Sequence, residues 1–374
     1  MKNNSLIIVL FVLLCVLDGL SQTKPYRTLK DLQPGKEVVL RLETGNNNPR
    51  NSEGDFITLK DGRILFIYTH YTGQSGSDWG NAYLASRFSS DNGKTWSQES
   101  KIEVQQEGVN NVMSVSMVRL PNGSIALFNL KIDGEFLCSP WMRISTDEGN
   151  TWGKPWKCIP DRNGYLQVNN DRVVLLENGR LLMPVVEHNV RHQKWDSIAS
   201  KGIIWNFWSD DLGISWNSGK NMDYPVNAPA GTIMQEPGVV ELKNGDILMY
   251  MRTSSHVQYI SRSKDHGVNW SPAEPSNIAS PRSPAVIKRI PSTGDLIMVW
   301  NNNGENENRT PLSIAISRNN GKSWEKTKNI EDDPSGSFSY PAIHFTNNGV
   351  LVSYCAKGLS VTYISKLSLD WIYK

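Results

Sequence analysis

The chain has 374 residues, of which 39% are hydrophobic and 20% are charged, and its formal net charge is +2 at pH 7. A chain of this length and composition can bury a large core within one domain. The near-neutral charge argues against a nucleic-acid partner.

The first 21 residues are expected to be a signal peptide. Lys2 precedes an apolar run over residues 6–17, and Gly19, Leu20 and Ser21 offer small residues near a cleavage point. The apolar run is too short for a membrane span. We therefore expect a protein exported to the periplasm or secreted, with residues 22–374 forming one domain.

One type of β-hairpin turn recurs along the rest of the chain. Asp-Gly or Asn-Gly between apolar runs predicts a tight turn, because the centre of such a turn requires positive φ. The turns lie at Asp61-Gly62, Asn122-Gly123, Asn178-Gly179, Asn244-Gly245, Thr293-Gly294 and Asn348-Gly349.

A second motif, here called the Trp motif, follows five of these hairpins. It has the form Ser-x-Asp-x-Gly-x-Thr-Trp, with small variations, and its tryptophans are spaced 56, 64, 54 and 54 residues apart. Ser and Asp side chains can bond nearby backbone N–H groups, and Gly supplies positive φ. The motifs occupy Ser89–Trp96, Ser145–Trp152, Ser209–Trp216, Ser263–Trp270 and Ser317–Trp324.

A long-period repeat of strand pairs predicts an all-β fold in which the repeats stack radially, as a six-bladed β-propeller. Each blade is then strand 1, hairpin turn, strand 2, a variable loop, strand 3, Trp motif and strand 4. The last repeat lacks the motif. We expect the segment around residues 37–42 to supply the closing strand, which leaves no free sheet edge.

Strand parity assigns the functional face. Turns between strands 1 and 2 and between strands 3 and 4 lie at one end of the propeller, so the long loops between strands 2 and 3 lie at the other end. Loops on a rigid scaffold often carry function. The polar residues assigned to this second end form one candidate set, which comprises Arg50, Asp78, Glu236, Arg252, Arg309 and Tyr340.

Three guanidinium groups that converge on one mouth would repel one another unless an anion lies between them. Arginine is also well suited to bidentate binding of a carboxylate. The arrangement of Arg50, Arg252 and Arg309 therefore indicates a site for a carboxylated ligand.

With these repeats and residues, the chain resembles the exo-α-sialidase (neuraminidase) family, in which the Trp motif is known as the Asp box. The resemblance covers essentially the whole mature chain. It implies that Arg50, Arg252 and Arg309 hold the sialic acid carboxylate. It also implies an acid/base role for Asp78 in Gly76-Ser-Asp-Trp79, and a nucleophile and its partner in Tyr340 and Glu236.

The sequence departs from the family pattern after the first arginine. Ile-Pro usually follows there, whereas Arg50 is followed by Asn51-Ser-Glu-Gly-Asp55. The polar stretch Asn169–Arg172 lies at the same end of the propeller, so Arg172 could replace or supplement one arginine and Asn170 is a further substrate-binding candidate. The substrate could therefore be a nonulosonic acid related to sialic acid.

A tyrosine nucleophile suits such a substrate because the anomeric carbon carries a carboxylate, which would repel Asp or Glu. Glu236 would take the phenolic proton, and the nearby arginines would favour the phenolate. Asp78 would protonate the leaving oxygen and then deprotonate water. The expected activity is a retaining exo-α-sialidase acting on sialylated or other acidic glycans.

Two other functions remain open from the sequence. One is a glycan-binding propeller without turnover, and the other is a propeller enzyme acting on a different acidic sugar. We expect no metal, since Glu187, His188 and His192 lie in a loop without a convincing third ligand. We also expect no cofactor and a monomer. Cys138 and Cys158 could pair or remain buried free thiols, and Cys355 would then be unpaired.

Overall fold

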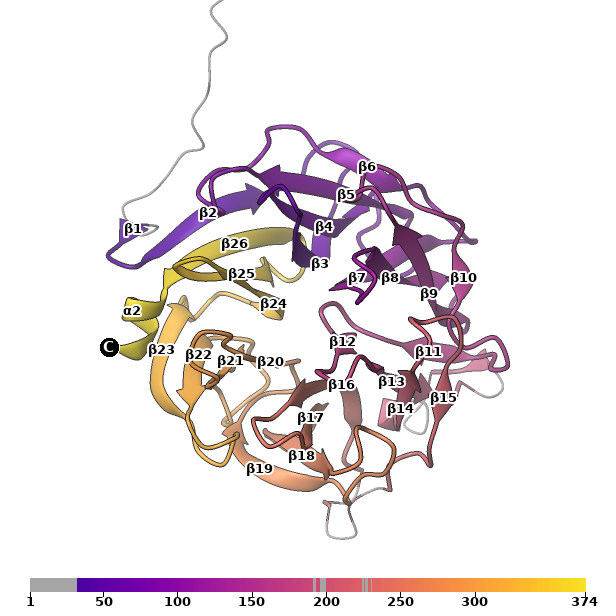
Figure 1. Ribbon diagram of the computed structural model, residues 1–374, viewed down its shortest axis with the longest axis vertical. Coiled ribbons are helices and arrows are strands. Elements are labelled where there is room, and N and C mark those ends of the chain that lie inside the picture. Colours follow the sequence, from indigo (N-terminus) through magenta and orange to yellow (C-terminus); the bar gives the residue numbers. More distant parts are fainter. Residues whose placement is uncertain (1–31, 191–192, 196–199, 224, 226–227, 230) are drawn as a thin grey trace, which may run out of the picture.

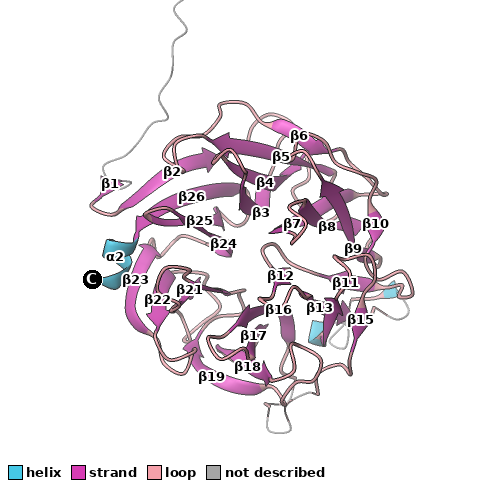
Figure 2. Ribbon diagram, in the orientation of Figure 1, coloured by secondary structure: helices cyan, strands magenta, loops and turns pink. Residues whose placement is uncertain are grey.

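The computed structural model describes residues 32–190, 193–195, 200–223, 225, 228–229 and 231–374. Strands dominate it, and they form successive antiparallel groups arranged as a ring around a central axis (Figures 1 and 2). The predicted all-β fold is confirmed. The predicted signal peptide lies outside the described residues.

Antiparallel pairing between neighbours in the chain defines each group. Group 1 contains β3 (Asn51–Thr58), β4 (Ile64–Tyr71), β5 (Ala82–Ser89) and β6 (Lys101–Val104). Group 2 contains β7 (Asn111–Arg119), β8 (Ile125–Ile132), β9 (Cys138–Ser145) and β10 (Trp156–Lys157). Group 3 contains β11 (Tyr165–Gln167), β12 (Val174–Leu175), β13 (Leu181–His188), β14 (Ile203–Ser209) and β15 (Asn217–Ser218).

The second half of the chain follows the same plan. Group 4 contains β16 (Met234–Glu241), β17 (Ile247–Thr253), β18 (Val257–Ser263) and β19 (Glu274–Ala279). Group 5 contains β20 (Val286–Arg289), β21 (Leu296–Asn301), β22 (Leu312–Ser317) and β23 (Glu325–Glu331). Group 6 contains β24 (Ser339–Thr346), β25 (Gly349–Ala356) and β26 (Val361–Ser368).

The N-terminal strand joins the sheet of group 6. β2 (Lys36–Leu42) pairs antiparallel with β26, and β1 (Leu32–Gln33) pairs with β2. The first and last parts of the described chain therefore share a sheet, with the helix α2 (Leu369–Tyr373) beside it (Figure 1). The predicted pairing of the segment around residues 37–42 with the last repeat is confirmed.

Groups 1, 2 and 3 are joined by hydrogen bonds into one 13-stranded sheet. The links are single parallel bridges, from Ala82 to Asn111 and from Tyr165 to Cys138. Each bridge lies where the chain passes from one group to the next.

The Trp motifs have the predicted local hydrogen bonds. In the first, Ser89 Oγ accepts from Gly93 N at 2.9 Å, and Asp91 Oδ1 accepts from Thr95 N at 2.8 Å. Trp96 is buried and lies 6.1 Å from Phe56, ring centre to ring centre. Its cluster also includes side chains of group 6, so this tryptophan packs between two neighbouring groups.

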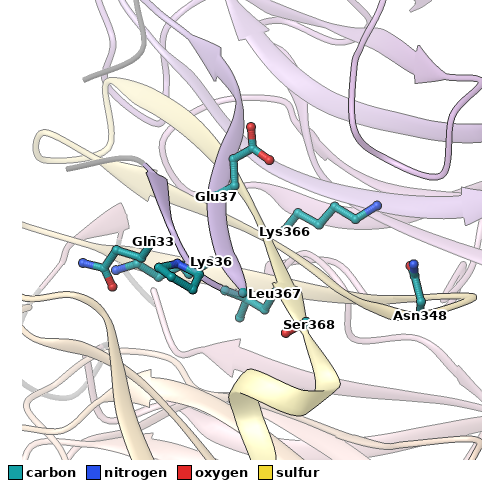
Figure 3. A pocket seen from close by; sticks show the side chains of 9 residues that line it. Gln33, Lys36, Glu37, Asn348, Lys366, Leu367 and Ser368 are labelled. Atoms are coloured by element: carbon teal, nitrogen blue, oxygen red, sulfur yellow. The ribbon is translucent and has the colours of Figure 1, made fainter. Parts of the chain in front are cut away.

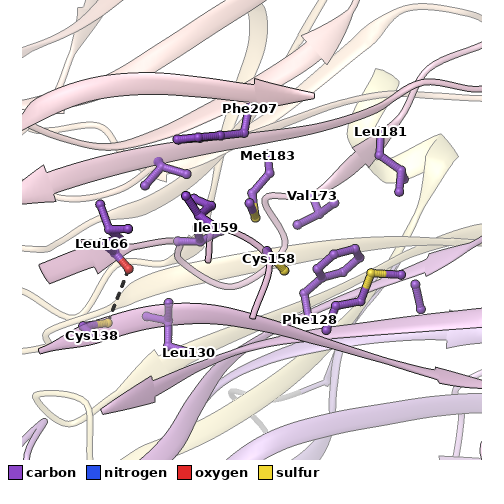
Figure 4. Close-up of a cluster of buried hydrophobic side chains, with 14 of the residues drawn as sticks. Phe128, Leu130, Cys138, Cys158, Ile159, Leu166, Val173, Leu181, Met183 and Phe207 are labelled. Carbon is purple, nitrogen blue, oxygen red and sulfur yellow. Dashed lines mark hydrogen bonds between the residues drawn. The ribbon is translucent and has the colours of Figure 1, made fainter. Parts of the chain in front are cut away.

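The largest buried cluster lies between groups 2 and 3 (Figure 4). Both Cys138 and Cys158 belong to it, and both are free thiols, as is the buried Cys355. The Cys138 thiol donates to Leu166 O at 3.4 Å. The structure therefore contains no disulfide among the cysteines that it describes, which settles the question that the sequence left open.

Strand pairing places the candidate residues at one edge of the ring. Asn51 at the start of β3 pairs with His70 near the end of β4, and Met234 at the start of β16 pairs with Thr253 at the end of β17. The hairpin turns connect the opposite ends of these strands. The starts of the inner strands and the ends of the second strands thus share an edge, as parity predicts.

Among the described residues, no helix has the length and apolar character needed to cross a membrane.

Candidate active site

Four inner strands share one backbone irregularity near their starts. The pairing register of β3, β7, β16 and β24 shifts there, as at a β-bulge. Within each shift, one non-glycine residue has φ between 48° and 56°: Glu53, Ser114, Glu236 and Tyr340. A left-handed conformation costs such residues on the order of 1–3 kcal/mol and is frequent at functional sites.

Small residues let these bulges lie close to the next strand. A Cβ atom added to Gly54 would lie 2.4 Å from the Phe66 ring, and one added to Gly238 would lie 2.4 Å from the Tyr250 ring. Glycine after Glu53, and two residues after Glu236, therefore permits the aromatic side chain to pack under the bulge. This packing fixes the strand that carries each carboxylate.

Arg50 is buried and has protein partners on all three of its guanidinium nitrogens. Its Nε donates to Ser52 Oγ at 2.9 Å, and its Nη2 contacts Glu53 Oε1 at 2.8 Å. Its Nη1 contacts Asp78 Oδ1 at 2.6 Å. The Arg50 side chain is only 3% exposed, whereas that of Asp78 is half exposed. The buried arginine therefore holds Asp78 at the rim of the site.

Glu236, Arg252 and Tyr340 meet at the same edge of the ring. Arg252 Nη1 lies 2.7 Å from Glu236 Oε2. The Tyr340 hydroxyl donates a hydrogen bond to Glu236 Oε1 at 3.0 Å. One carboxylate thus connects an arginine from β17 to a phenol from β24.

Arg309 approaches the same phenol from the loop before β22. Its guanidinium carbon lies 5.7 Å from the centre of the Tyr340 ring. Its Nη2 donates to Arg282 O at 3.4 Å. Among the described residues, no carboxylate forms an ion pair with Arg309, which leaves this cation available to an anionic ligand.

The charges around Tyr340 and Glu236 define a donor and an acceptor. Burial is the main reason that the pKa of Tyr340 lies well above its usual value, and Glu236 adds to this effect. Burial would also raise the pKa of Glu236, but Arg252, Arg309 and the Tyr340 hydrogen bond together hold it below its usual value. At neutral pH a protonated phenol therefore donates to an ionised carboxylate.

The sequence predicted that the arginines would favour the phenolate. Arg252 and Arg309 do lower the pKa of Tyr340. That prediction is confirmed for these two arginines, although burial and the charge of Glu236 outweigh them, so the pKa of Tyr340 in the free protein still lies above its usual value.

Glu53 and Ser114 are site residues to which the sequence assigned no role. Glu53 Oε2 accepts a short hydrogen bond from Ser114 Oγ. Burial raises the pKa of Glu53 to about 7, against the opposing effect of Arg50, and Asp78 and Glu236 also raise it. The two halves of the site therefore interact electrostatically. Glu53 and Ser114 occupy positions in the repeat that are equivalent to those of Glu236 and Tyr340, and this equivalence is the signal that could have identified them.

The candidates Asn170 and Arg172 are both buried, and both donate hydrogen bonds to backbone carbonyl oxygens. Arg172 is 2% exposed, and its Nη2 donates to Ala285 O at 2.7 Å. Asn170 is 1% exposed, and its Nδ2 donates to two backbone carbonyl oxygens. The hydrogen bond of Arg172 therefore links the segment before β12 to the residue before β20 of group 5.

Metal ligands do not cluster in the described part of the chain, where no group of three or more His, Cys, Asp or Glu side chains could hold an ion. His188 instead lies 5.3 Å from the Trp195 ring, centre to centre, and 5.7 Å from the Tyr165 ring. His192 lies outside the described residues.

An open pocket of about 360 Å³ lies elsewhere, where the turn between β1 and β2 meets the end of β26 (Figure 3). Glu37 and Lys366 line it, together with Ser368, and none of the candidate residues does. The candidate site is therefore defined here by its converging side chains.

Comparison with known proteins identifies the family. The BNR repeat-like domain matches residues 109–352, and the chain belongs to this family. A sialidase from Bacteroides fragilis is 24% identical over 212 residues, which are 53% of this chain and 36% of the relative. The chain thus matches about a third of the length of that relative.

Two solved structures have a similar fold. The NanB sialidase from Streptococcus pneumoniae has a TM-score of 0.69 at 15% identity, with 90% of this chain and 71% of that chain covered. The intramolecular trans-sialidase from Ruminococcus gnavus has a TM-score of 0.67 at 14% identity, with 88% of this chain and 97% of that chain covered. At these identities the similarity establishes a sialidase-like BNR fold.

Proposed function

We propose that the protein is a retaining exo-α-sialidase that releases terminal sialic acid, or a related nonulosonic acid, from glycans. One observation carries the proposal: the Tyr340 hydroxyl donates to Glu236, whose other oxygen is paired with Arg252. A phenol bonded to an ionised base is the arrangement that a tyrosine nucleophile requires. The B. fragilis relative, itself a sialidase, adds support.

In the first step, the phenolic oxygen of Tyr340 attacks the anomeric carbon while the bond to the glycosidic oxygen breaks. Glu236 takes the phenolic proton, and Asp78 in its acid form gives a proton to the leaving oxygen. Arg252 and Arg309 bind the substrate carboxylate, and its negative charge partly offsets the repulsion between them.

In the second step, Asp78 takes a proton from water, and the resulting hydroxide attacks the same carbon. The bond to Tyr340 breaks, and Glu236 returns the proton to the phenolate. Two inversions give net retention of configuration. Arg50 Nη1, 2.6 Å from Asp78 Oδ1, keeps Asp78 in place as a hydrogen-bond donor when the carboxyl group is protonated and as an ion-pair partner when it is ionised.

Further parts of the proposal concern the whole chain. We infer that residues 22–374 form a single propeller of six blades, one for each of the groups in the ring, and that the protein is a monomer. We infer export through the signal peptide at residues 1–21, to the periplasm or the exterior. The partners would then be sialylated or other acidic glycans.

A fluorogenic α-sialoside tests the proposal directly. Release of the fluorophore by the wild-type protein, with an early product of retained configuration, is the expected result. The assay is repeated with deaminated and octulosonic analogues to define the sugar. A product lighter by one water would indicate intramolecular transfer, and binding without turnover would favour a glycan-binding propeller instead.

A further inference from the structure

The inner strand of group 3 is interrupted at the axis. β11 and β12 both pair with β13, and residues 168–173 between them leave the sheet. This axial segment reaches the middle of the ring (Figure 1). It contains Asn169, Asn170, Asp171 and Arg172, each of which is at most 7% exposed.

The axial segment bonds to inner strands on the other sides of the axis. Asp171 N donates to Val115 O at 2.9 Å, which joins group 2. Asp171 Oδ2 accepts from Ile343 N at 2.9 Å, and its Oδ1 lies 2.5 Å from Lys288 Nζ. These contacts connect groups 6 and 5 to the same short stretch of group 3.

Asn170 joins the two bulges that carry Glu53 and Tyr340. Its Nδ2 donates to Gly54 O at 3.1 Å and to Tyr340 O at 3.2 Å. Gly54 directly follows Glu53, and both Glu53 and Tyr340 have left-handed φ values, of 54° and 52°. Such a conformation persists when the surroundings fix it. A buried amide with two donor hydrogens can satisfy both carbonyl oxygens at once.

We propose that Asn170 is a positioning residue for Tyr340. It acts through the backbone, by holding the Tyr340 carbonyl and thereby the bulge that presents the phenol to Glu236. This inference rests on the proposed function for its catalytic consequence, while its structural consequence can be measured separately.

Three substitutions test the proposal in the full-length protein. Asn170→Ala removes both hydrogen bonds. Asn170→Asp keeps the shape, and its neutral form can donate one hydrogen bond while its ionised form can donate none. Asn169→Ala is the matched control, because Asn169 is 2% exposed and its amide has no hydrogen-bond partner among the described residues.

We expect kcat to fall about 30-fold or more in Asn170→Ala, with the affinity for an unreactive sialic acid analogue changed less than threefold. Asn169→Ala should keep kcat within threefold of wild type. In Asn170→Asp, the kcat relative to wild type should fall at least tenfold between pH 5 and pH 8, at unchanged analogue affinity. A kcat of Asn170→Ala within threefold of wild type would overturn the proposal.

If Asn170→Ala fails to fold, the pH profile of Asn170→Asp decides. A parallel loss of kcat, analogue affinity and folded fraction would mean that Asn170 has only a general structural role, against the proposal.

Crystal structures of the folded variants separate this inference from the proposed function. We expect φ of Tyr340 to leave the left-handed region and the Tyr340–Glu236 distance to exceed 3.0 Å in the Asn170 variants. An unchanged bulge would refute the positioning role whatever the activity. Absence of turnover in the wild type, with an altered bulge in the variants, would refute only the sialidase proposal.

Discussion

The Tyr340 hydroxyl and the Glu236 carboxylate lie 3.0 Å apart, although 104 residues separate them in the chain. Each residue occupies the left-handed position of a bulge near the start of its inner strand. The pair therefore arises from repetition of one backbone feature around the ring. Because both bulges lie at the same edge, two sequence-distant side chains can form one proton-transfer pair.

Tyr340→Phe tests whether that pair reacts. The substitution removes the hydroxyl and preserves the ring, so the fold and the arginines should be retained. We expect kcat on an activated sialoside to fall roughly 10³-fold or more, with little change in the affinity for an unreactive acidic-sugar analogue. A fluorinated sialoside should label wild type at Tyr340 and leave the variant unlabelled.

Tyr373→Phe is the control for that experiment, since this tyrosine lies in α2 and its hydroxyl donates to Asp295 at 2.9 Å. It should retain wild-type turnover. Undiminished hydrolysis by Tyr340→Phe would exclude the phenolate mechanism.

Arg252→Ala and Arg309→Ala test recognition of the carboxylate. Each removes a charge-assisted contact in a partly desolvated site, and we expect a loss of roughly 2–4 kcal/mol in kcat/KM. Arg252→Ala should have the larger effect, because it also removes the ion-pair partner of Glu236. Arg63→Ala, at a hairpin turn, should behave as wild type. Near-wild-type activity of either site variant would show that the arginine does not bind the carboxylate.

Trp96→Ala tests the structural role of the Trp motif. Trp96 is 8% exposed and packs on Phe56 and Phe66 within a cluster shared by groups 1 and 6. Truncation of a buried tryptophan should cost about 3–5 kcal/mol of the free energy of unfolding. Trp79→Ala, at a residue that is 38% exposed, should cost far less. If urea unfolding showed equal losses in the free energy of unfolding for Trp96→Ala and Trp79→Ala, the packing role of Trp96 would be contradicted.

The repeat architecture could be predicted from the sequence because its signals are local. An Asn-Gly turn or a Ser89–Trp96 motif specifies its own hydrogen bonds within a few residues, as the contacts of Asp91 illustrate. Strand parity then assigned Arg50, Glu236 and Tyr340 to one edge without any knowledge of tertiary contacts.

The roles of residues inside the ring could not be predicted in this way. The position of Arg172 depends on residues 168–173 leaving the sheet and reaching the middle of the ring, which no local pattern indicates. The pairing of Glu53 with Ser114 joins two different groups. The pKa of Tyr340 depends on its burial, which outweighs the arginines that the sequence did identify.

Glu53→Gln tests the electrostatics of this interior through the pH dependence of stability. Burial raises the pKa of Glu53 from the ordinary value of 4.5 to about 7, so the folded state retains a proton that the unfolded state releases. The favourable contribution is complete below pH 4.5 and is lost as the pH rises to 7. The range of about 2.5 pH units corresponds to roughly 3 kcal/mol.

The glutamine variant has no such proton to release. Relative to wild type, its free energy of unfolding should therefore increase by roughly 3 kcal/mol between pH 4.5 and pH 7 and stay constant above that range. Urea unfolding of both proteins at several pH values measures this difference in the free energy of unfolding. The contributions of the other titrating groups are the same in both proteins and therefore cancel in the difference. Glu99→Gln, at an exposed position, should run parallel to wild type. If Glu53→Gln also runs parallel, Glu53 is ionised throughout the range and its ion pair with Arg50 outweighs its burial.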